Sequence, residues 1–245
     1  MYVIVTRPSP DGEAFAAEAS RLGATPILSP AMAIRDRAGE VDLAGVEALA
    51  FTSANGVRAF ARLSTRRDFR VFAVGDATAA AAGAVGFAHV AVADGDVESL
   101  SQLIAPTKLS SHVLHLAGSD RAGNLVMMLA AKGVGARRAV IYDAVKIEQL
   151  SEGAKAALME EGAKIAVALF SPRSARLFLD QARSSGVADR LERAVALCLS
   201  AEVAAAASAA KWAAIEIAAV RTADGVLALI EEMLAGRNGR TGAAR

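Results

Sequence analysis

The sequence has a single cysteine, few aromatic residues and no long uninterrupted hydrophobic segment. Cys198 lies in the apolar stretch AVALCLS and has no second thiol for an internal disulfide or a CxxC metal site, so we interpret it as a core residue. The N-terminal stretch MYVIVTRPSP becomes polar after a few residues, and no apolar run approaches the ~20 residues that span a bilayer. These absences predict a protein of the reducing cytoplasm with no membrane partner.

An excess of charge of one sign is also missing. The chain has 27 Lys and Arg residues against 26 Asp and Glu residues, spread along its length, which gives a formal net charge of +1. This balance disfavours nucleic acid as a partner but allows a small anionic ligand. His89, His112 and His115 lack the spacing of metal ligands, and the Walker A, GxSxG and GxGxxG motifs are absent. The sequence therefore predicts no metal site, phosphate-binding loop or serine hydrolase site.

Short apolar runs alternate with stretches of helical periodicity, and hydrophobic residues make up 54% of the chain. Runs of this length without alternation are typical of strands buried on both faces, as in parallel sheets covered by helices. The intervening stretches space their apolar residues as helices do. We therefore expect an α/β fold built from Rossmann-like or flavodoxin-like parallel-sheet units. The runs are YVIV, EALAF, RVFAV, HVAV, HVLHL, RAVIY, IAVALF, AVALCL and AIEIAAV.

The sequence repeats itself. FTSANGVRAF at 51–60 recurs as LFSPRSARLF at 169–178, a shift of 118 positions that places Ser53 on Ser171. Each serine follows a predicted buried strand and begins a predicted helix, where a hydroxyl and backbone N–H groups can bind an anion.

The repeat continues beyond this strand-to-helix turn, which we call a corner. The stretch at 70–92 is matched at 194–218 with a shift of 125, which places Gly75 on Ser200 and Phe87 on Trp212, and DVESLSQLI is then matched by TADGVLALI. The inner copy has a fourth strand–helix unit that begins at HVLHL, whereas the outer copy ends at the C-terminus. The first 30 residues resemble this fourth unit, so the N-terminus belongs with the C-terminal half.

We therefore predict two α/β domains with one inserted into the other. Domain 1 is discontinuous and comprises 1–33 and 148–235, domain 2 comprises 36–144, and residues 236–245 form a flexible tail. The chain crosses between the domains twice, which predicts a two-stranded hinge and a ligand cleft between the domains.

Several segments together resemble the uroporphyrinogen-III synthase family over residues 1–234. They are VTRP, FTSANGVRAF, VFAVGDATA, LAG followed by Arg121, VIYDAV with Tyr142, LFSPRSARLF and RTADGV with Thr222 and Gly225. The resemblance implies a monomeric enzyme of tetrapyrrole and heme biosynthesis with no cofactor or metal, and a fold of two α/β domains joined by two strands. Its substrate would be hydroxymethylbilane, a linear tetrapyrrole with eight carboxylates. The enzyme would close it to uroporphyrinogen III with loss of water, inverting ring D through a spiro intermediate.

The resemblance also implies roles for individual residues. Tyr142 is the expected catalytic residue, because a phenol with a pKa near ~10 remains a proton donor at neutral pH. Each expected substrate-binding residue also has an ordinary structural interpretation, such as a helix cap, a tight turn or an ion pair. The expected substrate-binding residues are Arg7, Ser53, Asn55, Gly75, Thr78, Ser99, Gly118, Arg121, Ser171, Ser174, Ser200 and Thr222.

One position departs from the family pattern. Arg221 stands where the family has a proline before Thr222. A non-catalytic two-domain binding protein for a small anionic ligand is the alternative that explains the repeat equally well. Tyr142 and Thr222 favour the enzyme. A receiver-type regulatory module would need an acidic cluster after the first strand, and VTRP has none.

Overall fold

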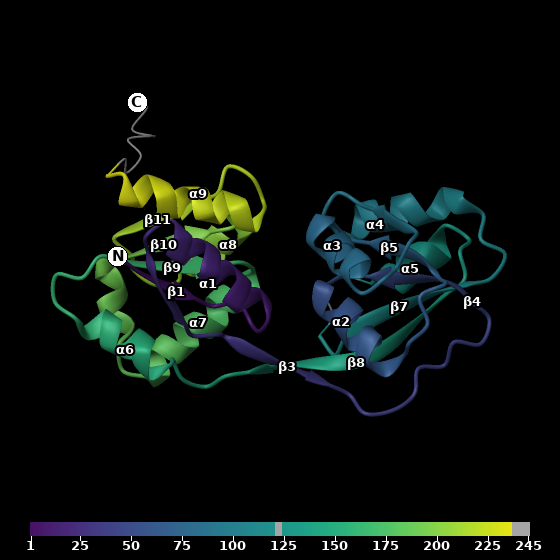
Figure 1. Cartoon of the computed structure of the whole chain (residues 1–245), viewed down its shortest axis with the longest axis horizontal. Coiled ribbons are helices and arrows are strands. Elements are labelled where there is room, and N and C mark those ends of the chain that lie inside the picture. Colours follow the sequence, from purple (N-terminus) through teal and green to yellow (C-terminus); the bar gives the residue numbers. More distant parts are fainter. Residues whose placement is uncertain (121–123, 237–245) are drawn as a thin grey trace. The chain divides into compact units, whose positions relative to one another are not determined.

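A computed structural model describes residues 1–120 and 124–236 as two compact units (Figure 1). Unit 1 contains residues 1–33 and the described residues from Val145 onward, and unit 2 contains Ile34–Ala144. Both are α/β, which confirms the predicted fold class. Arg121 and all of the predicted tail except Gly236 lie outside the described residues.

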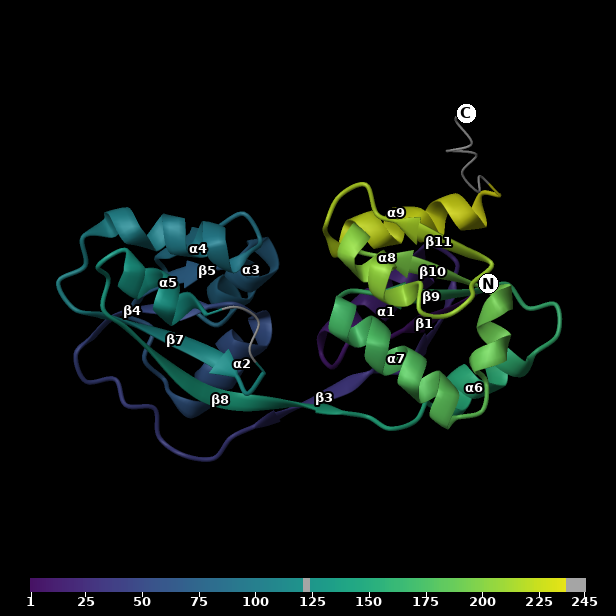
Figure 2. The same cartoon turned by 180° about the vertical axis from the view of Figure 1, so that it is seen from behind.

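Unit 1 contains a five-stranded sheet in the order β11-β10-β9-β1-β2, and all neighbouring strands are parallel. Val3 and Val5 pack on one face with α1 and α9, while Ile4 packs on the other with α6, α7 and α8. Figure 2 shows α7 and α8 in front of this sheet. Both faces are thus buried, as the apolar runs predict. The strands are β1 (Tyr2–Val5), β2 (Thr25–Leu28), β9 (Ile165–Leu169), β10 (Ala194–Cys198) and β11 (Ala214–Ile217). The helices are α1 (Asp11–Arg21), α6 (Glu152–Met159), α7 (Pro172–Ser184), α8 (Ala201–Ala207) and α9 (Ala223–Leu234), with a 3₁₀ segment at Ala188–Arg193.

Unit 2 contains most of a six-stranded sheet in the order β3-β8-β7-β4-β5-β6. One face packs against α2 and α3 and the other against α4 and α5. The boundary between the units falls within β3 and β8, so strands rather than loops carry both crossings. The strands are β3 (Met32–Asp36), β4 (Val46–Phe51), β5 (Arg70–Ala73), β6 (Val90–Val92), β7 (His112–Gly118) and β8 (Ala136–Lys146). The helices are α2 (Ala54–Leu63), α3 (Asp76–Ala84), α4 (Val97–Ile104) and α5 (Leu125–Ala131), with a 3₁₀ segment at Ala105–Thr107.

The two sheets have the same strand order. The series β11-β10-β9-β1-β2 in unit 1 corresponds to β6-β5-β4-β7-β8 in unit 2, so β1 occupies the place of β7. The register agrees as well, because Val71 pairs with Val90 and, 125 positions later, Ala196 pairs with Ile215. The repeated sequence thus encodes a repeated topology.

The repeat also preserves an aromatic stack in the core. Phe60 and Phe87 have ring centroids 6.1 Å apart and an interplanar angle of 26°. Their counterparts Phe178 and Trp212 lie 6.2 Å apart at 23°. In each unit the stack joins the first helix of the repeat to the segment before its third strand, so it fixes how that helix lies on the sheet.

Truncating one partner of the unit 1 stack tests its contribution. We expect Phe178→Ala to lower the free energy of unfolding of unit 1 by about 3–5 kcal/mol, because a fully buried ring is removed. Trp212 is the only tryptophan, so its fluorescence during denaturant unfolding follows unit 1. Phe60→Ala is the matched control and should shift the tryptophan transition less. An unchanged midpoint for Phe178→Ala would contradict the importance of the stack.

Candidate active site

The predicted binding residues of unit 1 follow the carboxyl ends of its strands. Arg7 follows β1, Ser171 follows β9, Ser200 follows β10 and Thr222 follows β11. Because these strands are parallel, their carboxyl ends lie along one edge of the sheet. The chain proceeds from β1 to β2 in one direction and from β9 to β11 in the other, so β1 and β9 flank the topological switch point, where open α/β sheets bind ligands. Arg7 and Ser171 are the candidates at this switch point.

Arg7 is held over the end of β9. Its guanidinium carbon lies 4.7 Å from the ring centroid of Phe170, the residue before Ser171, and its Nη2 lies 3.2 Å from Oδ2 of Asp11. The side chain remains 24% exposed. A Cβ atom on Gly12 would lie 2.6 Å from the Arg7 carbonyl oxygen, so glycine lets this loop fold onto the first turn of α1. Asp11, Gly12 and Phe170 were not predicted, although a glycine in a first helical turn can indicate such a close approach.

Ser171 and Ser174 form a reciprocal cap at the start of α7. The Ser174 N–H donates to Oγ of Ser171 at 3.0 Å, and the Ser171 N–H donates to Oγ of Ser174 at 3.0 Å. The Ser174 hydroxyl also donates to the Ser171 carbonyl at 2.9 Å, and Ser174 is only 5% exposed. The Ser171 hydroxyl donates in turn to Oγ of Ser174 at 3.0 Å, so the cap uses both hydroxyls, and Ser171 is the more accessible of the two residues.

Thr222 and Ser99 occupy different positions in their helices. Thr222 caps α9, and its Oγ1 accepts the N–H of Gly225 at 3.2 Å. A Cβ atom on Gly225 would lie 2.1 Å from the Val220 carbonyl oxygen, so this loop requires glycine there. In unit 2 the cap of α4 is Asp96, and Ser99 completes a capping box with it. Asp96 is therefore the structural counterpart of Thr222.

Ser200 belongs to a polar chain that the sequence did not predict. Its hydroxyl donates to Oε2 of Glu202 at 2.5 Å, and Arg221 forms an ion pair with the same carboxylate. The hydrogen bond from Ser200, a backbone hydrogen bond and Arg221 together lower the pKa of Glu202 to about 2. Arg221, at the family's proline position, thus ties the loop before α9 to the start of α8. The only sequence signal was an acidic residue in a first helical turn.

The corners of unit 2 after β4 and β5 carry the next candidates. Ser53 caps α2 by accepting the Asn55 N–H at 3.2 Å, and Oδ1 of Asn55 accepts from Arg58 at 3.1 Å. Gly75 caps α3 with an extended backbone, and Thr78 is buried in the first turn. A Cβ atom on Gly75 would make only ordinary contact, 3.4 Å from a backbone atom of the next loop. The turn itself therefore does not require glycine at this position.

Tyr142 lies on β8 beside the end of β7. The residue is 8% exposed and packs in the core cluster of α2 and β4. A Cβ atom on Gly118 would lie 2.8 Å from both Cε2 and Cζ of the ring, and one on Gly56 would lie 3.8 Å from Cε1. Because β4 and β7 flank the switch point of unit 2, the structure brings Tyr142 and Gly118 to the helix start that carries Ser53 and Asn55.

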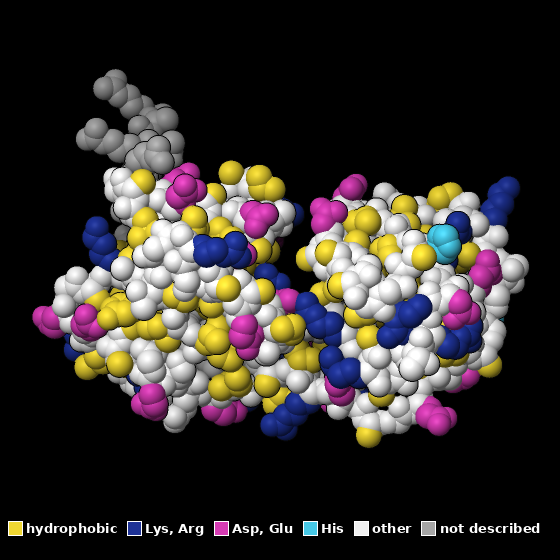
Figure 3. Space-filling model, in the orientation of Figure 1, with side chains coloured by type: hydrophobic (Ala, Val, Ile, Leu, Met, Phe, Trp, Pro, Cys, Tyr) yellow, Lys and Arg dark blue, Asp and Glu magenta, His cyan; other side chains and the backbone are white. Residues whose placement is uncertain are grey.

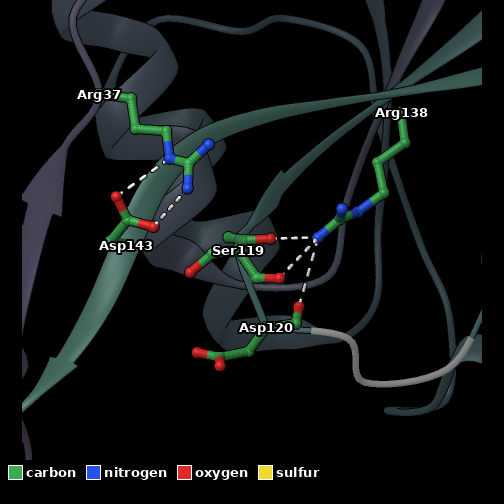
Figure 4. A network of polar contacts seen from close by, with 6 residues as sticks. Arg37, Ser119, Asp120, Arg138 and Asp143 are labelled. Atoms are coloured by element: carbon green, nitrogen blue, oxygen red, sulfur yellow. Dashed lines mark hydrogen bonds and ion pairs between the residues drawn. The ribbon is translucent and has the colours of Figure 1, made fainter.

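Two arginines, Arg37 and Arg138, form polar contacts with residues around Tyr142 and the end of β7 (Figure 4). Asp143 accepts from Arg37 Nε at 3.0 Å and Nη2 at 2.9 Å, and its pKa is lowered first by Arg37 and then by Ser119. Arg138 donates to the carbonyl oxygens of Gly118, Ser119 and Asp120. The carboxyl end of β7 is thus held by a guanidinium. Sequence patterns gave no signal for these contacts, because they depend on strand pairing.

Two buried ionisable groups, His115 in unit 2 and Cys198 in unit 1, are neutral at pH 7. Nε2 of His115 lies 3.2 Å from Oγ1 of Thr52, and burial, with a smaller effect of Arg138, lowers the pKa of His115 to about 4. Burial raises the pKa of Cys198 to about 12.

Within residues 1–120 and 124–236, no group of three or more His, Cys, Asp or Glu side chains could hold a metal ion. In that same part of the chain, no helix is long and apolar enough to cross a membrane.

The fold and these corners define a class of protein: a two-unit α/β protein with polar strand ends at the switch point of each sheet and a buried tyrosine beside one of them. The family model described as uroporphyrinogen-III synthase HemD matches residues 13–228, and the chain belongs to this family. The resemblance seen in the sequence is thereby confirmed. Members of this family are lyases that cyclise hydroxymethylbilane.

Solved structures agree in fold. Uroporphyrinogen-III synthetase from Helicobacter pylori has a TM-score of 0.65 and 19% identity, covering 95% of this chain and 98% of that one. A mutant uroporphyrinogen III synthase from Thermus thermophilus has a TM-score of 0.55 and 19% identity, covering 96% of this chain and 99% of that one. A comparison with curated protein sequences gave no match.

The Ser200–Glu202–Arg221 chain can be tested by titration. We expect Ser200→Ala to raise the pKa of Glu202 toward 4.5 by more than Arg221→Met does, because the hydrogen bond from Ser200 is the larger cause of the shift. Since the folded pKa lies below the unfolded one, ionised Glu202 stabilises the fold above about pH 4.5, and this contribution is lost as pH falls toward about 2. Carboxyl NMR signals followed with pH measure both effects. A larger shift for Arg221→Met would contradict the assignment.

Proposed function

We propose that this chain closes hydroxymethylbilane to uroporphyrinogen III, with loss of water and inversion of ring D through a spiro intermediate. The observation that carries the proposal is the family match over residues 13–228, which includes Ser53, Ser171 and Tyr142.

Orientation is the main task of such an enzyme. Once the terminal hydroxyl has left as water, the substrate carries a reactive cation, and unguided closure gives the uninverted isomer I. An enzyme that forms isomer III must hold the chain so that the substituted carbon of ring D attacks first. Correct orientation of reacting groups can be worth as much as ~7–11 kcal/mol. Binding residues at several strand ends suit this task better than one strongly activating group would.

The substrate carboxylates are bound, in this proposal, by the predicted residues at the strand ends. In unit 1 the partly exposed guanidinium of Arg7 and the helix starts capped by Ser171 and Thr222 are the leading candidates. In unit 2 they are Ser53 and Asn55 at the start of α2. Each charge-assisted hydrogen bond contributes about 1.5–3 kcal/mol, so several contacts hold a polyanion without a large excess of cations.

The remaining predicted substrate-binding residues have weaker geometric support. The capping boxes already use the hydroxyls of Ser99 and Ser174, and Ser200 already donates to Glu202. These three act, in the proposal, by shaping helix starts. Gly75, where the turn does not require glycine, and the buried Thr78 remain proposed contacts through the first turn of α3.

Tyr142 is the proposed proton donor. A phenol can give its proton to the departing hydroxyl, which then leaves as water. Tyr142 is the predicted residue at the unit 2 switch point that carries such a group, and its ring is set in a well-packed core cluster. A fixed ring gives the proton a defined direction.

The protein's state and location complete the proposal. We expect a monomer of the cytoplasm that needs no cofactor or metal and binds neither nucleic acid nor membrane. The family's biosynthetic role supports the cytoplasm. Figure 3 shows side chains of both signs on both units, with several basic ones around α2. The formal net charge of only +1 supports the absence of a nucleic-acid partner.

The reaction is tested directly by its isomer ratio. Freshly prepared hydroxymethylbilane is given to the purified protein with EDTA and no added cofactor, and the oxidised uroporphyrins are separated by chromatography. We expect isomer III to predominate and to give way to isomer I as the protein is diluted out. Isomer I alone, formed at the rate of the protein-free control, would refute the enzyme and leave the binding-protein alternative.

The role of Tyr142 is tested by Tyr142→Phe. We expect kcat for isomer III to fall about tenfold, less than the ~10²–10⁴-fold typical of general acids, because this hydroxyl departs readily. KM should stay within about twofold, since the ring is kept. Tyr2→Phe, at the start of β1, is the matched control and should be silent. An unchanged kcat would remove Tyr142 from the mechanism.

A further inference from the structure

We propose that Gly118 is a positioning residue for the phenol of Tyr142 and does not bind substrate. Its missing side chain leaves the space that the tyrosine ring fills. The functional half of this inference rests on the proposed synthase activity, whereas its structural half does not.

The ring, and not the backbone, requires glycine at this position. A Cβ atom on Gly118 would lie 2.8 Å from Cε2, 2.8 Å from Cζ and 3.1 Å from Oη of Tyr142. Real Cβ atoms essentially never approach a heavy atom within 3.0 Å. Gly118 is not among the glycines with positive φ, so any residue could adopt its backbone conformation. The three atoms nearest to such a Cβ all belong to the tyrosine, which therefore excludes a larger side chain.

The backbone of Gly118 is anchored and cannot easily yield to the ring. Gly118 pairs with Tyr142 across a register irregularity in the β7–β8 ladder. The next residue, Ser119, donates its N–H to the Tyr142 carbonyl at 3.0 Å, and Arg138 donates to the Gly118 carbonyl. An added methyl group must therefore displace the ring.

Gly56, in the first turn of α2, lies at the opposite edge of the ring. A Cβ atom on Gly56 would lie 3.8 Å from Cε1 of Tyr142, 3.0 Å from the Leu116 carbonyl oxygen and 3.3 Å from Cδ1 of Phe51. The absence of a side chain on Gly56 thus lets the first turn of α2 approach the end of β7 closely. The Tyr142 ring lies between two glycines, so a ring pushed away from Gly118 moves toward α2 and carries its hydroxyl with it.

A kinetic cycle separates positioning from substrate binding. In the wild-type background we expect Gly118→Ala to lower kcat for isomer III about tenfold, matching Tyr142→Phe, with KM within about twofold. In the Tyr142→Phe background it should lower kcat less than twofold further, because the hydroxyl that it misplaces is already gone. A KM increase that persists in both backgrounds would indicate direct substrate contact and overturn the proposal.

The control variant is Gly135→Ala, before the opposite end of β8. A Cβ atom there would lie 3.1 Å from Cδ2 of His112, an exposed side chain that can move aside. We expect wild-type kcat and KM for this variant. A loss equal to that of Gly118→Ala would mean that the β7–β8 pair tolerates no added methyl group, and the positioning role would be refuted.

An NMR measurement tests the packing of the Tyr142 ring against Gly118 without an activity assay. The chain has two tyrosines, Tyr2 and Tyr142, so ring-labelled tyrosine gives two sets of signals that Tyr2→Phe assigns. Gly118→Ala should shift the Tyr142 ring signals and leave those of Tyr2 in place, whereas Gly135→Ala should move neither. Unchanged Tyr142 signals would refute the positioning of the ring by Gly118, even if the wild-type protein forms isomer III.

The two ideas fail in different ways. If the wild-type protein forms only isomer I but the NMR shift appears, the proposed function is refuted and the positioning of the ring by Gly118 is supported. If Gly118→Ala does not fold, Gly118→Ala/Tyr142→Ala decides, because removal of the ring should restore folding to the level of Tyr142→Ala. Failure of this double variant to fold would overturn the proposal.

Discussion

Both sheets must be buried on both faces, and this constraint decides where polar chemistry can stand. Val3, Ile4 and Val5 are fully buried although they face opposite sides of one strand, so the interior of β1 has no place for a reactive side chain. Polar residues are displaced to the strand ends, where helices begin. Because the strands are parallel, these ends gather at one edge of each sheet. The same packing that stabilises the fold therefore concentrates caps and cations at the switch points.

The repeat gives two such edges, and the chain has used them differently. In unit 1 the edge carries charge: Arg7 over Phe170, and the Ser200–Glu202–Arg221 chain. In unit 2 it carries the phenol of Tyr142 between two glycines, with Arg138 bracing the strand end. Shared topology set equivalent positions, while different residues at those positions gave each unit its own chemistry. In the proposed function both units therefore bind substrate carboxylates, and unit 2 also supplies the proton donor.

Much of the fold could be predicted from the sequence because its signals are local. Apolar runs of strand length predicted buried parallel strands, and Ser53 and Ser171 were predicted to begin helices, as they do. The contacts of the candidate site were less predictable. The packing of Tyr142 against Gly118 depends on a register irregularity between β7 and β8. The pairing of Arg221 with Glu202 depends on the ends of β10 and β11 lying side by side. Neither leaves a pattern in a single sequence. For Gly75 the sequence suggested a turn that needs a small residue, whereas the structure shows that this turn does not require glycine.

The central claim is that a polycarboxylate tetrapyrrole binds at the carboxyl ends of the strands in both sheets. Titration of ¹⁵N-labelled protein with uroporphyrinogen III, kept reduced, tests it most directly. The account predicts that the amide signals of Ser53, Ser171 and Thr222 shift, and that those of Gly45 and Gly135, near the amino ends of strands, do not. Shifts confined to the amino ends of the strands, or to the carboxyl ends of only one sheet, would contradict it.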